Sequence, residues 1–329
     1  MKINCMGSVR IKLHMNENNI DILLAIYNGE RYVCEQIASI FNQSYKKWQL
    51  IVRDDGSKDK SEIIIKEYAK KYPERVQHII DVPNNLGAYQ NFAKLLEHSD
   101  ADYVMFSDQD DVWLPDKVEK SITLMKEMEK QYSRSMPLLV HTDLQVAQED
   151  LTIVSKSFWE YQNVEPQKSL VLNRLLVRSV IRGCTVMINR SLANLAQSIP
   201  NDAIMHDHWI SLIAAAFGKI GFIREPTMIY RLHEKNYSGG KPWSARYIFD
   251  KIFTEAGRSD LRDYLSKTQR QAAAFARQFE KKLSRDSYNM INAYATLGDR
   301  GFLWKRWAIV KYGFLNVGIV RNIGMFFFI

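Results

Sequence analysis

Three carboxylates stand within four positions of the chain, at Asp108, Asp110 and Asp111. They follow the apolar run 103–106, which has the length and composition of a short buried strand. Carboxylates this close repel one another unless a cation lies among them, and Mg²⁺ and Mn²⁺ prefer carboxylate oxygens. In an α/β sheet, ligands bind beyond the carboxyl ends of the strands. The segment therefore predicts a divalent cation site at Asp108 and Asp110, with a solvated acidic turn as the alternative.

A second acidic turn has the same construction. The apolar run 50–52 is followed by Asp54, Asp55, Gly56 and Ser57, and Asp-Gly-Ser is typical of a turn. The motif alone is weak, because many turns between a strand and a helix resemble it. The pair of turns, about fifty residues apart, is the stronger indication of a site, because both turns would meet at one edge of a parallel sheet.

A third acid, Asp207, lies between His206 and His208 and opens an apolar run that continues through Ala216. Aspartate is favoured at the start of a helix, so a structural cap is one interpretation. The other interpretation is a general base, which needs a carboxylate beside the reacting hydroxyl. A zinc site is disfavoured, because residues two apart on a helix point to different faces.

Polar residues also end the apolar stretch before position 231. Arg231 or Lys235 is predicted to face a phosphate, and His233 is predicted to complete the metal site. A rim of solvated charges is the alternative interpretation.

These residues need a scaffold in which strands and helices alternate. Residues 20–143 show that alternation, which is typical of a mostly parallel sheet with helices on its faces. Residues 144–240 are mixed, and helical patterns resume at Trp243. The expected strands are 20–26, 50–52, 76–80, 103–106, 138–142, 184–188 and 221–231, and the expected helices are 30–43, 61–72, 88–98, 115–131, 169–179 and 207–217.

The composition excludes several classes of protein. The chain of 329 residues is 46% hydrophobic and 25% charged, as in globular proteins. Its three cysteines, Cys5, Cys34 and Cys184, form no close pair, which indicates a reducing compartment and no disulfide framework. Neither a dinucleotide-binding glycine motif nor a Walker loop is present. The first eighteen residues lack the apolar core of a signal peptide, and no stretch reaches the length of a membrane-spanning helix.

The formal charge of +8 is unevenly distributed. Residues 241–329 hold 16 basic and 7 acidic side chains, a net charge of +9, while the remaining residues hold 29 and 30, a net charge of −1. Such a basic segment is typical of proteins that contact nucleic acid or an anionic membrane surface. A solvated helical face is the alternative.

The motifs, in this order, resemble those of family 2 glycosyltransferases of the GT-A fold, and most closely the bacterial rhamnosyltransferases of cell-wall and capsular polysaccharide synthesis. The resemblance covers roughly residues 20–240. It depends on the stretches 25–30, 35–37, 42–45, 54–57, 85–87, 91–92, 107–113, 183–185, 206–209 and 230–233. The form Asp-Gln-Asp-Asp-Val-Trp at 108–113 is the part that points to rhamnosyltransferases.

The resemblance implies a role for each matching position. Asp207 is implied as the general base, and Asp55 as the acid that accepts a hydrogen bond from the donor nucleobase. The metal ligands would be Asp108, Asp110 and His233. The other implied donor-binding residues are Ala25, Tyr27, Glu30, Asp54, Asn85, Gly87, Ser107, Gln109 and Arg231, and the implied acceptor-binding residues are Asp111, Trp113, His206, His208 and Trp209. His208 departs from the family pattern, because relatives often carry tryptophan there.

The resemblance also implies the reaction. A divalent cation, Mg²⁺ or Mn²⁺, would neutralise the leaving diphosphate, and a single base would deprotonate the acceptor hydroxyl, so that transfer proceeds with inversion. The expected donor is dTDP-L-rhamnose, with another nucleotide sugar such as a UDP-hexose as the alternative. The expected acceptor is a saccharide, free or lipid-linked, and nucleic acid is not an expected partner.

Two other classes of protein share parts of the pattern. Haloacid-dehalogenase-type phosphatases use Asp-x-Asp after a strand with the first acid as nucleophile, but that motif normally follows the first strand. Here three predicted strands precede the strand that leads to Asp108. A glycan-binding protein without catalysis would not need all three acidic sites to remain.

The predicted organisation is a polar lead-in at 1–19, a GT-A domain at 20–240 and a basic, aromatic-rich helical region at 241–329. From Arg300 to Ile329 there are five basic residues and no acid, with aromatic residues interleaved. This pattern favours a cytoplasmic enzyme held at the inner face of the cell membrane. The alternatives are that the aromatic residues pack on the catalytic domain or on a second copy in a homodimer.

Overall fold

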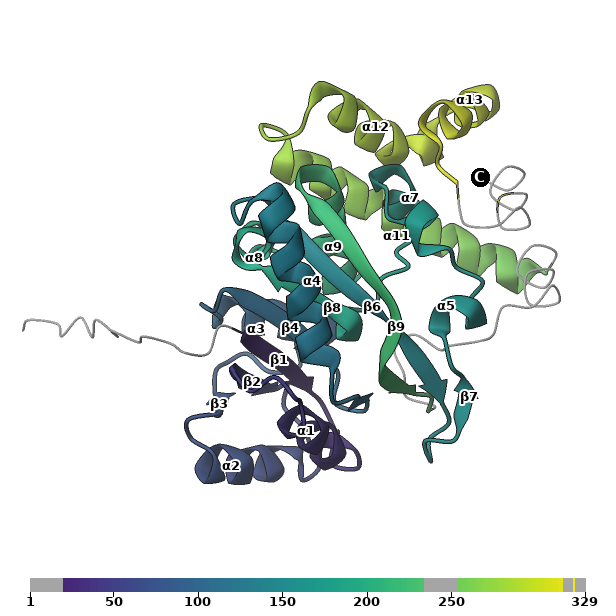
Figure 1. The fold of residues 1–329 in the computed structure, drawn as a ribbon. Helices are drawn as coiled ribbons and strands as arrows, with labels where there is room; N and C mark the ends of the chain where they lie inside the picture. The colour runs from purple at the N-terminus through teal and green to yellow at the C-terminus, as the bar shows by residue number, and fades with distance from the viewer. Residues whose placement is uncertain (1–19, 234–253, 316–321, 323–329) are drawn as a thin grey trace, which may run out of the picture.

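The computed structural model describes residues 20–233, 254–315 and 322 (Figure 1). The predicted lead-in at 1–19 and the predicted domain boundary at 239–242 lie outside these residues. In the described part of the chain, nine strands form one sheet in the order β3-β2-β1-β4-β8-β6-β9-β5, with β7 paired to β6. The fold is therefore the predicted mixed α/β architecture.

The first half of the sheet is parallel, as the alternation of strand and helix predicts. β1 pairs in parallel with both β2 and β4, and β2 pairs in parallel with β3. Parallel pairing brings the carboxyl ends of these strands to one edge, which is where the acidic turns follow. The elements are β1 (Ile20–Ile26), α1 (Val33–Phe41), β2 (Trp48–Asp54), α2 (Ser61–Lys71), β3 (Val76–Ile79), α3 (Ala88–Glu97) and β4 (Tyr103–Ser107).

The second half of the sheet is mixed. β8 runs antiparallel to both β4 and β6, while β6 and β9 are parallel. The strands are β5 (Val112–Trp113), β6 (Leu138–Ala147), β7 (Ile153–Ser155), β8 (Val186–Asn189) and β9 (Lys219–Arg231). The two-residue strand β5 pairs with β9, so it brings the end of the acidic segment to the edge of the second half.

Alternating side chains of β1 separate two hydrophobic cores. Ile22 and Leu24 face one core with α1 and α4 (Lys117–Tyr132), whereas Leu23 faces the other core with α3. A strand buried on both faces in this way reads as a continuous apolar run, which is why 20–26 was recognisable in the sequence.

Short helices fill the region between β7 and β9. A single helix over 169–179 was expected, but the structure has two short helices there. Leu170 and Val171 separate them, and the backbone of Val171 is extended. The elements are α5 (Phe158–Tyr161), α6 (Pro166–Ser169), α7 (Leu172–Val177), the 3₁₀ turn η1 (Gly183–Thr185), α8 (Arg190–Ala196) and α9 (His206–Phe217).

The C-terminal extension is helical, as predicted, and packs on the sheet domain. It comprises α11 (Glu255–Phe279), α12 (Arg285–Ala295), the 3₁₀ turn η2 (Leu297–Asp299) and α13 (Phe302–Tyr312). In Figure 1 these helices lie at the end of the molecule opposite α1 and α2. Phe275 and Phe279 of α11 contact Trp209 of α9 and belong to the same hydrophobic core as Leu23. The extension and the sheet therefore share one core.

Among the described residues, none of the helices combines the length and the apolar character that crossing a bilayer requires.

Candidate active site

A cavity of about 910 Å³ lies beyond the carboxyl ends of β1, β2 and β4. Its volume is near the upper end of the range for ligand sites, which run from roughly 300 to 1,000 Å³. The lining includes Asp55, Asp108, Asp110 and Asp207. All three acidic segments selected from the sequence therefore meet in one place.

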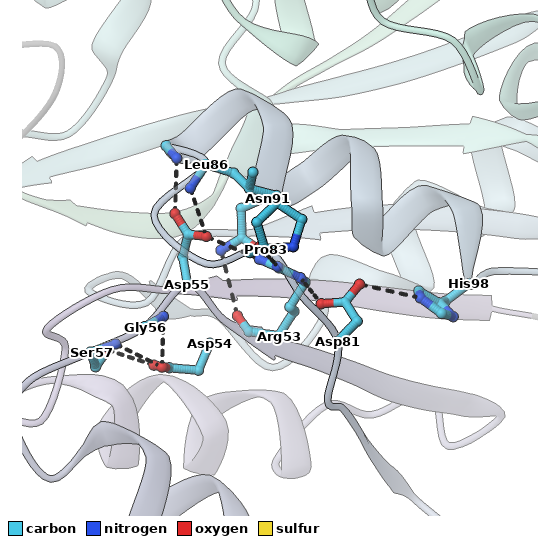
Figure 2. Close-up of polar contacts among 11 residues, drawn as sticks. Arg53, Asp54, Asp55, Gly56, Ser57, Asp81, Pro83, Leu86, Asn91 and His98 are labelled. Atoms are coloured by element: carbon cyan, nitrogen blue, oxygen red, sulfur yellow. Dashed lines mark hydrogen bonds and ion pairs between the residues drawn. The ribbon is translucent and has the colours of Figure 1, made fainter.

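Asp55 is fixed by a buried network around Arg53 (Figure 2). The Arg53 guanidinium donates to Asp55 Oδ1 at 3.1 Å, to Asp81 Oδ1 at 2.7 Å and to the Pro83 carbonyl at 2.7 Å. The backbone N–H groups of Leu86 and Gly87 donate to the same Asp55 carboxylate at 3.0 and 2.8 Å. A carboxylate has about four acceptor positions, so Asp55 retains capacity for a donor group in the cavity.

Gly87 allows this arrangement because its φ is +82°, a backbone conformation that residues with a side chain rarely adopt. It also ends the loop before α3, so its N–H can turn toward Asp55. Gly87 and Asn85, both predicted to bind the donor, line the cavity.

Gln109 joins the acidic segment to the end of β1. Its side-chain amide accepts from the Tyr27 N–H at 2.8 Å and donates to the Tyr27 carbonyl at 3.1 Å. Gly29 makes room for this amide, because a Cβ there would lie 2.4 Å from Gln109 Oε1. Both Tyr27 and Gln109 line the cavity, so the contact holds the turn after β1 against the acidic loop.

Asp108 lies in a crowded acidic environment. Burial, followed by the charges of Asp110 and Asp207, raises the pKa of Asp108 to about 7. Burial, followed by the charges of Asp110 and Asp108, also raises the pKa of Asp111. Ligand atoms of Asp108, Asp111 and Cys184 lie within 4.8 Å of one another. Burial raises the pKa of the Cys184 thiol, so it remains protonated and is a poor ligand for a hard cation. The oxygen donors Asp108 and Asp110 therefore fit Mg²⁺ or Mn²⁺ better than a set that includes Cys184.

Asp110 is held by the residues that end β9. His233 Nε2 lies 2.6 Å from Asp110 Oδ2, and Arg231 Nε donates to the Asp110 carbonyl at 3.0 Å. Arg231 also forms an ion pair with Glu35 and donates to the Glu149 carbonyl. Arg231 is buried by these contacts and does not line the cavity. The expectation that Arg231 faces a phosphate is corrected: it positions the backbone of Asp110.

Asp207 lies in the first turn of α9 and faces the cavity. Its Oδ2 accepts from the Gly183 N–H at 2.9 Å, and its Oδ1 accepts from the His208 N–H at 2.6 Å. Gly183 permits the close approach, since a Cβ there would lie 2.7 Å from His206 Nε2 and 3.4 Å from Asp207 Cβ. The N-terminus of a helix stabilises a carboxylate in this position.

The two histidines beside Asp207 diverge. His206 packs on Phe92 with ring centroids 4.0 Å apart, whereas His208 Nε2 hydrogen-bonds the Leu175 carbonyl at 2.6 Å. Burial lowers the pKa of His206 to about 4 and also lowers that of His208. Both residues line the cavity, but their rings contact different elements.

The other predicted donor-binding residues divide into two groups. Ala25, Tyr27, Asp55, Asn85, Gly87, Asp108 and Gln109 line the cavity. Glu30, Asp54 and Ser107 do not: Glu30 accepts from the Lys60 N–H, Asp54 holds the turn at Gly56 and Ser57, and Ser107 hydrogen-bonds Gln36. Their polar atoms support the turns that carry the lining residues.

Three residues expected to contact the acceptor lie in the protein interior. Trp113 is 2% exposed and Trp209 is fully buried in the second core, against Phe275 and Phe279. Asp111 is 1% exposed, and none of the three lines the cavity. This expectation is corrected. An aromatic residue next to an acidic motif can pack in a hydrophobic core instead of lining a site, and Trp113 and Trp209 do so here.

The lining residues that were not predicted from the sequence include Arg182, Tyr264 and Lys267. Tyr264 and Lys267 come from α11 in the extension, 57 and 60 residues beyond Asp207. Their i,i+3 spacing on an amphipathic helix was visible, but nothing local indicated that this face would cover a cavity.

The sequence model of the family described as "Glycosyl transferase family 2" matches residues 21–136. The putative teichuronic acid biosynthesis glycosyltransferase TuaG of Bacillus subtilis (strain 168) is 30% identical over 228 residues, which cover 69% of this chain and 83% of that protein. The dTDP-rhamnosyl transferase RfbG of Shigella flexneri is 28% identical over 230 residues, covering 68% of this chain and 76% of that protein.

Solved structures agree with the fold. The S. aureus TarS fragment 1–349, solved in complex with UDP-GlcNAc, matches with a TM-score of 0.56 at 12% identity. The match covers 89% of this chain and 80% of that chain. The structural match spans more of the chain than the sequence matches do.

Proposed function

The chain belongs to glycosyl transferase family 2, and from that premise we propose that its cavity transfers a sugar, with inversion, from a nucleotide-sugar donor to a saccharide acceptor. The observation that supports this most directly is that Asp55, the pair Asp108 and Asp110, and Asp207 line one cavity. The proposed biological setting is bacterial surface polysaccharide synthesis, in agreement with the names of the relatives.

Asp108 and Asp110 would hold a divalent cation. The raised pKa of Asp108 supports this assignment, because clustered buried carboxylates are stabilised in their charged form by a cation. When bound, such a cation supplies Lewis-acid neutralisation of a diphosphate leaving group. His233 would orient Asp110 through their hydrogen bond, as residues behind a metal ligand commonly do.

Asp207 would take the proton from the attacking hydroxyl. Its two hydrogen bonds from backbone N–H groups fix the carboxylate without filling all of its acceptor positions. Direct attack by the activated hydroxyl on the anomeric carbon displaces the diphosphate from the opposite face, so the configuration inverts. From a β-linked L-rhamnose donor, the product would be an α-L-rhamnoside.

We propose dTDP-L-rhamnose as the donor. The Asp-Gln-Asp-Asp-Val-Trp motif and the similarity to RfbG support this choice over a UDP-hexose. Asp55 would accept from the N3–H of the thymine ring, which uracil also offers, so Asp55 does not separate the two bases.

The test is a panel of nucleotide sugars incubated with the protein and Mn²⁺ or Mg²⁺. Release of dTDP from the rhamnose donor, abolished by excess EDTA, is the expected result. Turnover of UDP-glucose or UDP-galactose with no turnover of dTDP-L-rhamnose would refute the donor assignment. Free phosphate released from sugar phosphates, with no nucleoside diphosphate released, would favour the phosphatase class instead.

We further propose that α13 attaches the enzyme to an anionic membrane surface. Phe302, Leu303, Trp307 and Val310 are 67, 81, 49 and 71% exposed along this helix. Its other face is anchored in the protein, where Ala308 and Ile309 are fully buried. The aromatic-rich segment thus both packs on the domain and presents an apolar surface.

The positive charge of α13 favours an anionic membrane as the partner of this exposed surface. Residues 302–315 contain Lys305, Arg306 and Lys311 and no acidic residue. Lys311 Nζ lies 4.4 Å from the centre of the Trp307 ring, so positive charge lies beside the apolar residues. Basic residues near an anionic leaflet each contribute about 1 kcal/mol, and aromatic residues favour the interface.

Sedimentation with phosphatidylglycerol vesicles at low salt tests the attachment. The double variant Leu303→Ser/Val310→Ser should remain in the supernatant while the wild type sediments. The matched control Ile63→Ser/Ile80→Ser removes two residues that are 58 and 78% exposed elsewhere, and it should sediment normally. Equal sedimentation of all three proteins would remove α13 from this role, and concentration-dependent mass in solution would instead favour a homodimer.

A further inference from the structure

Beyond Asp207, the cavity is bounded by Arg182, Tyr264 and Lys267, which we call the basic wall. Arg182 immediately precedes Gly183, whose N–H holds Asp207 at 2.9 Å, so it enters the cavity beside the base. Tyr264 and Lys267 are three residues apart and share one face of α11. The charges that act on the Tyr264 hydroxyl are those of Arg178, Arg182 and Asp207. Tyr264 therefore lies where the base and the cationic side chains meet.

The basic wall is held rigidly against the helix that carries Asp207. Gln271 Oε1 accepts from the Ile204 N–H at 2.9 Å, two residues before α9 begins. Thr268 and Tyr294 share a buried hydroxyl hydrogen bond of 2.8 Å, which ties α11 to α12. Trp209 of α9 packs between α9 and α11 with its ring centre 5.2 Å from that of Phe275. The distance between the base and the wall is thus fixed by the core.

Lys267 is positioned to exchange partners. Its Nζ forms an ion pair with Asp263 Oδ2 at 2.7 Å, with side chains 51 and 61% exposed. An exposed pair of this kind contributes little to stability, because solvent screens both charges. A ligand anion in the cavity can therefore compete with Asp263 for the ammonium. Arg182 packs over Phe158, 4.8 Å from its ring centre, which limits where its guanidinium can point.

From this arrangement we propose that the basic wall binds a negatively charged group of the acceptor, so that the acceptor is an anionic saccharide. The anion is a carboxylate of an acidic sugar or a phosphate attached to the sugar, and both are recognised by the same chemistry. The inference rests on the proposed function, because it takes Asp207 as the base for the acceptor hydroxyl. The Tyr264 hydroxyl stays protonated, since burial raises its pKa, and it can donate to the bound saccharide.

The wall belongs to the acceptor side because of its order in the cavity. Asp55 and Gly87 lie at the ends of β2 and the loop before α3, and Asp108 follows β4. Asp207 comes next, because its charge acts on both Asp108 and Tyr264, and α11 packs against the helix that carries Asp207. A donor bound at Asp55 and Asp108 places its anomeric carbon toward Asp207, which leaves the wall to the group that attacks.

Saturation-transfer NMR on the full chain tests the proposal. The sample contains Mg²⁺ and dTDP, so that the proposed donor site is occupied, and it contains no Mn²⁺. The probes are methyl β-D-glucuronide, glucose 6-phosphate and the neutral methyl β-D-glucoside. We expect the anionic probes to bind about tenfold more tightly than the neutral one, and we expect the difference to shrink at high salt. The stronger of the two anionic probes identifies the carboxylate or the phosphate as the preferred group.

Two variants change the wall in opposite directions. Lys267→Met should reduce the preference for anionic probes several-fold, whereas Asp263→Asn should increase it by releasing Lys267 from its ion pair. The matched control is Arg270→Gln on the same helix, which is exposed, bonded to Ser266 and outside the lining, and it should change nothing. A merely structural role for the ion pair predicts the same direction of change in both variants.

Equal binding of neutral and anionic probes, no binding of either anion, or an unchanged ratio in Lys267→Met would overturn the proposal. Weaker dTDP binding in Lys267→Met would place the wall on the donor side and would also overturn it. Failure of the proposed function is a separate result, namely no nucleoside diphosphate released from any nucleotide sugar. Anion preference can be present or absent in either case, so the two failures are distinguishable.

Discussion

The two sides of the cavity are built differently. The proposed donor side consists of residues 20–113, where side chains follow parallel strands and are fixed by polar contacts, as Asp55 is by Arg53, Leu86 and Gly87. The acceptor side consists of residues 138–233 and 254–315, where Asp207 meets Tyr264 only because two helices pack in one core. Polar contacts around the strand ends set the geometry of the first side, and apolar packing between helices sets that of the second.

The largest expected effect tests whether the donor side depends on its polar network. Arg53→Met would leave Asp55 buried without its cation, and breaking a buried pair in this way costs about 3–5 kcal/mol of unfolding free energy. Urea unfolding measures the loss. The control Arg134→Met removes a guanidinium that is 64% exposed and pairs with Asp102, so it should change stability by less than about 0.5 kcal/mol. A small loss in both variants would show that packing also governs the donor side.

Next in size is the effect of the base on turnover. Asp207→Asn keeps the shape of the side chain but cannot accept a proton, so kcat should fall about 10²-fold or more. Binding of the nucleoside diphosphate, measured by calorimetry, should stay within about twofold of wild type. Asp202→Asn alters a surface carboxylate in the segment before α9 and should leave both quantities unchanged. Activity near normal in Asp207→Asn would assign the base elsewhere.

The next effect in size is the loss of stability in acid, which we expect to arise on the acceptor side. His141 of β6 is buried, its ring nitrogens have no hydrogen-bond partner among the described residues, and burial lowers its pKa to about 3. The unfolded chain takes up this proton near pH 6.5 and the folded chain does not. Protonation of His141 in the unfolded chain therefore costs almost no stability above pH 6.5. It lowers the free energy of unfolding by about 2 kcal/mol between pH 7 and pH 5.

His141→Leu should remove that part of the pH dependence, as measured by urea midpoints at the two pH values. His98→Leu, on the donor side and 39% exposed, is the matched control and should leave the slope unchanged. The same slope in His141→Leu and wild type would contradict the assignment of the acid response to β6.

The smallest expected effect concerns Asp54, which was expected to contact the donor and instead holds a turn. Asp54→Ala removes the acceptor for the Gly56 and Ser57 N–H groups and should cost about 1 kcal/mol of stability. Donor affinity should fall less than in Asp55→Ala. An equal loss of affinity in the two variants would restore Asp54 to the donor site.

The contrast also explains what the sequence could predict. Asp55 and Asp108 were identifiable because each follows an apolar strand, and parallel strands bring such positions to one edge. Asp207 was identifiable because it starts an apolar helix. Arg231 was misplaced because its partners, Glu35 and the Glu149 carbonyl, are remote in sequence. Trp113 and Trp209 were misplaced because an aromatic side chain beside a motif fits a cavity or a core equally well until the helices are packed.

Trp209 has a further consequence, which concerns how such a chain can diversify. It lies two residues after the proposed base Asp207, yet its ring contacts α11, the helix that supplies Tyr264 and Lys267 of the proposed acceptor wall. An apolar joint of this kind accepts any partner helix of similar shape, because its contacts are not directional. Recombination between residues 113 and 183 could therefore exchange the acceptor side as a unit, and a lineage of such enzymes could acquire new acceptors while it inherits its donor site unchanged.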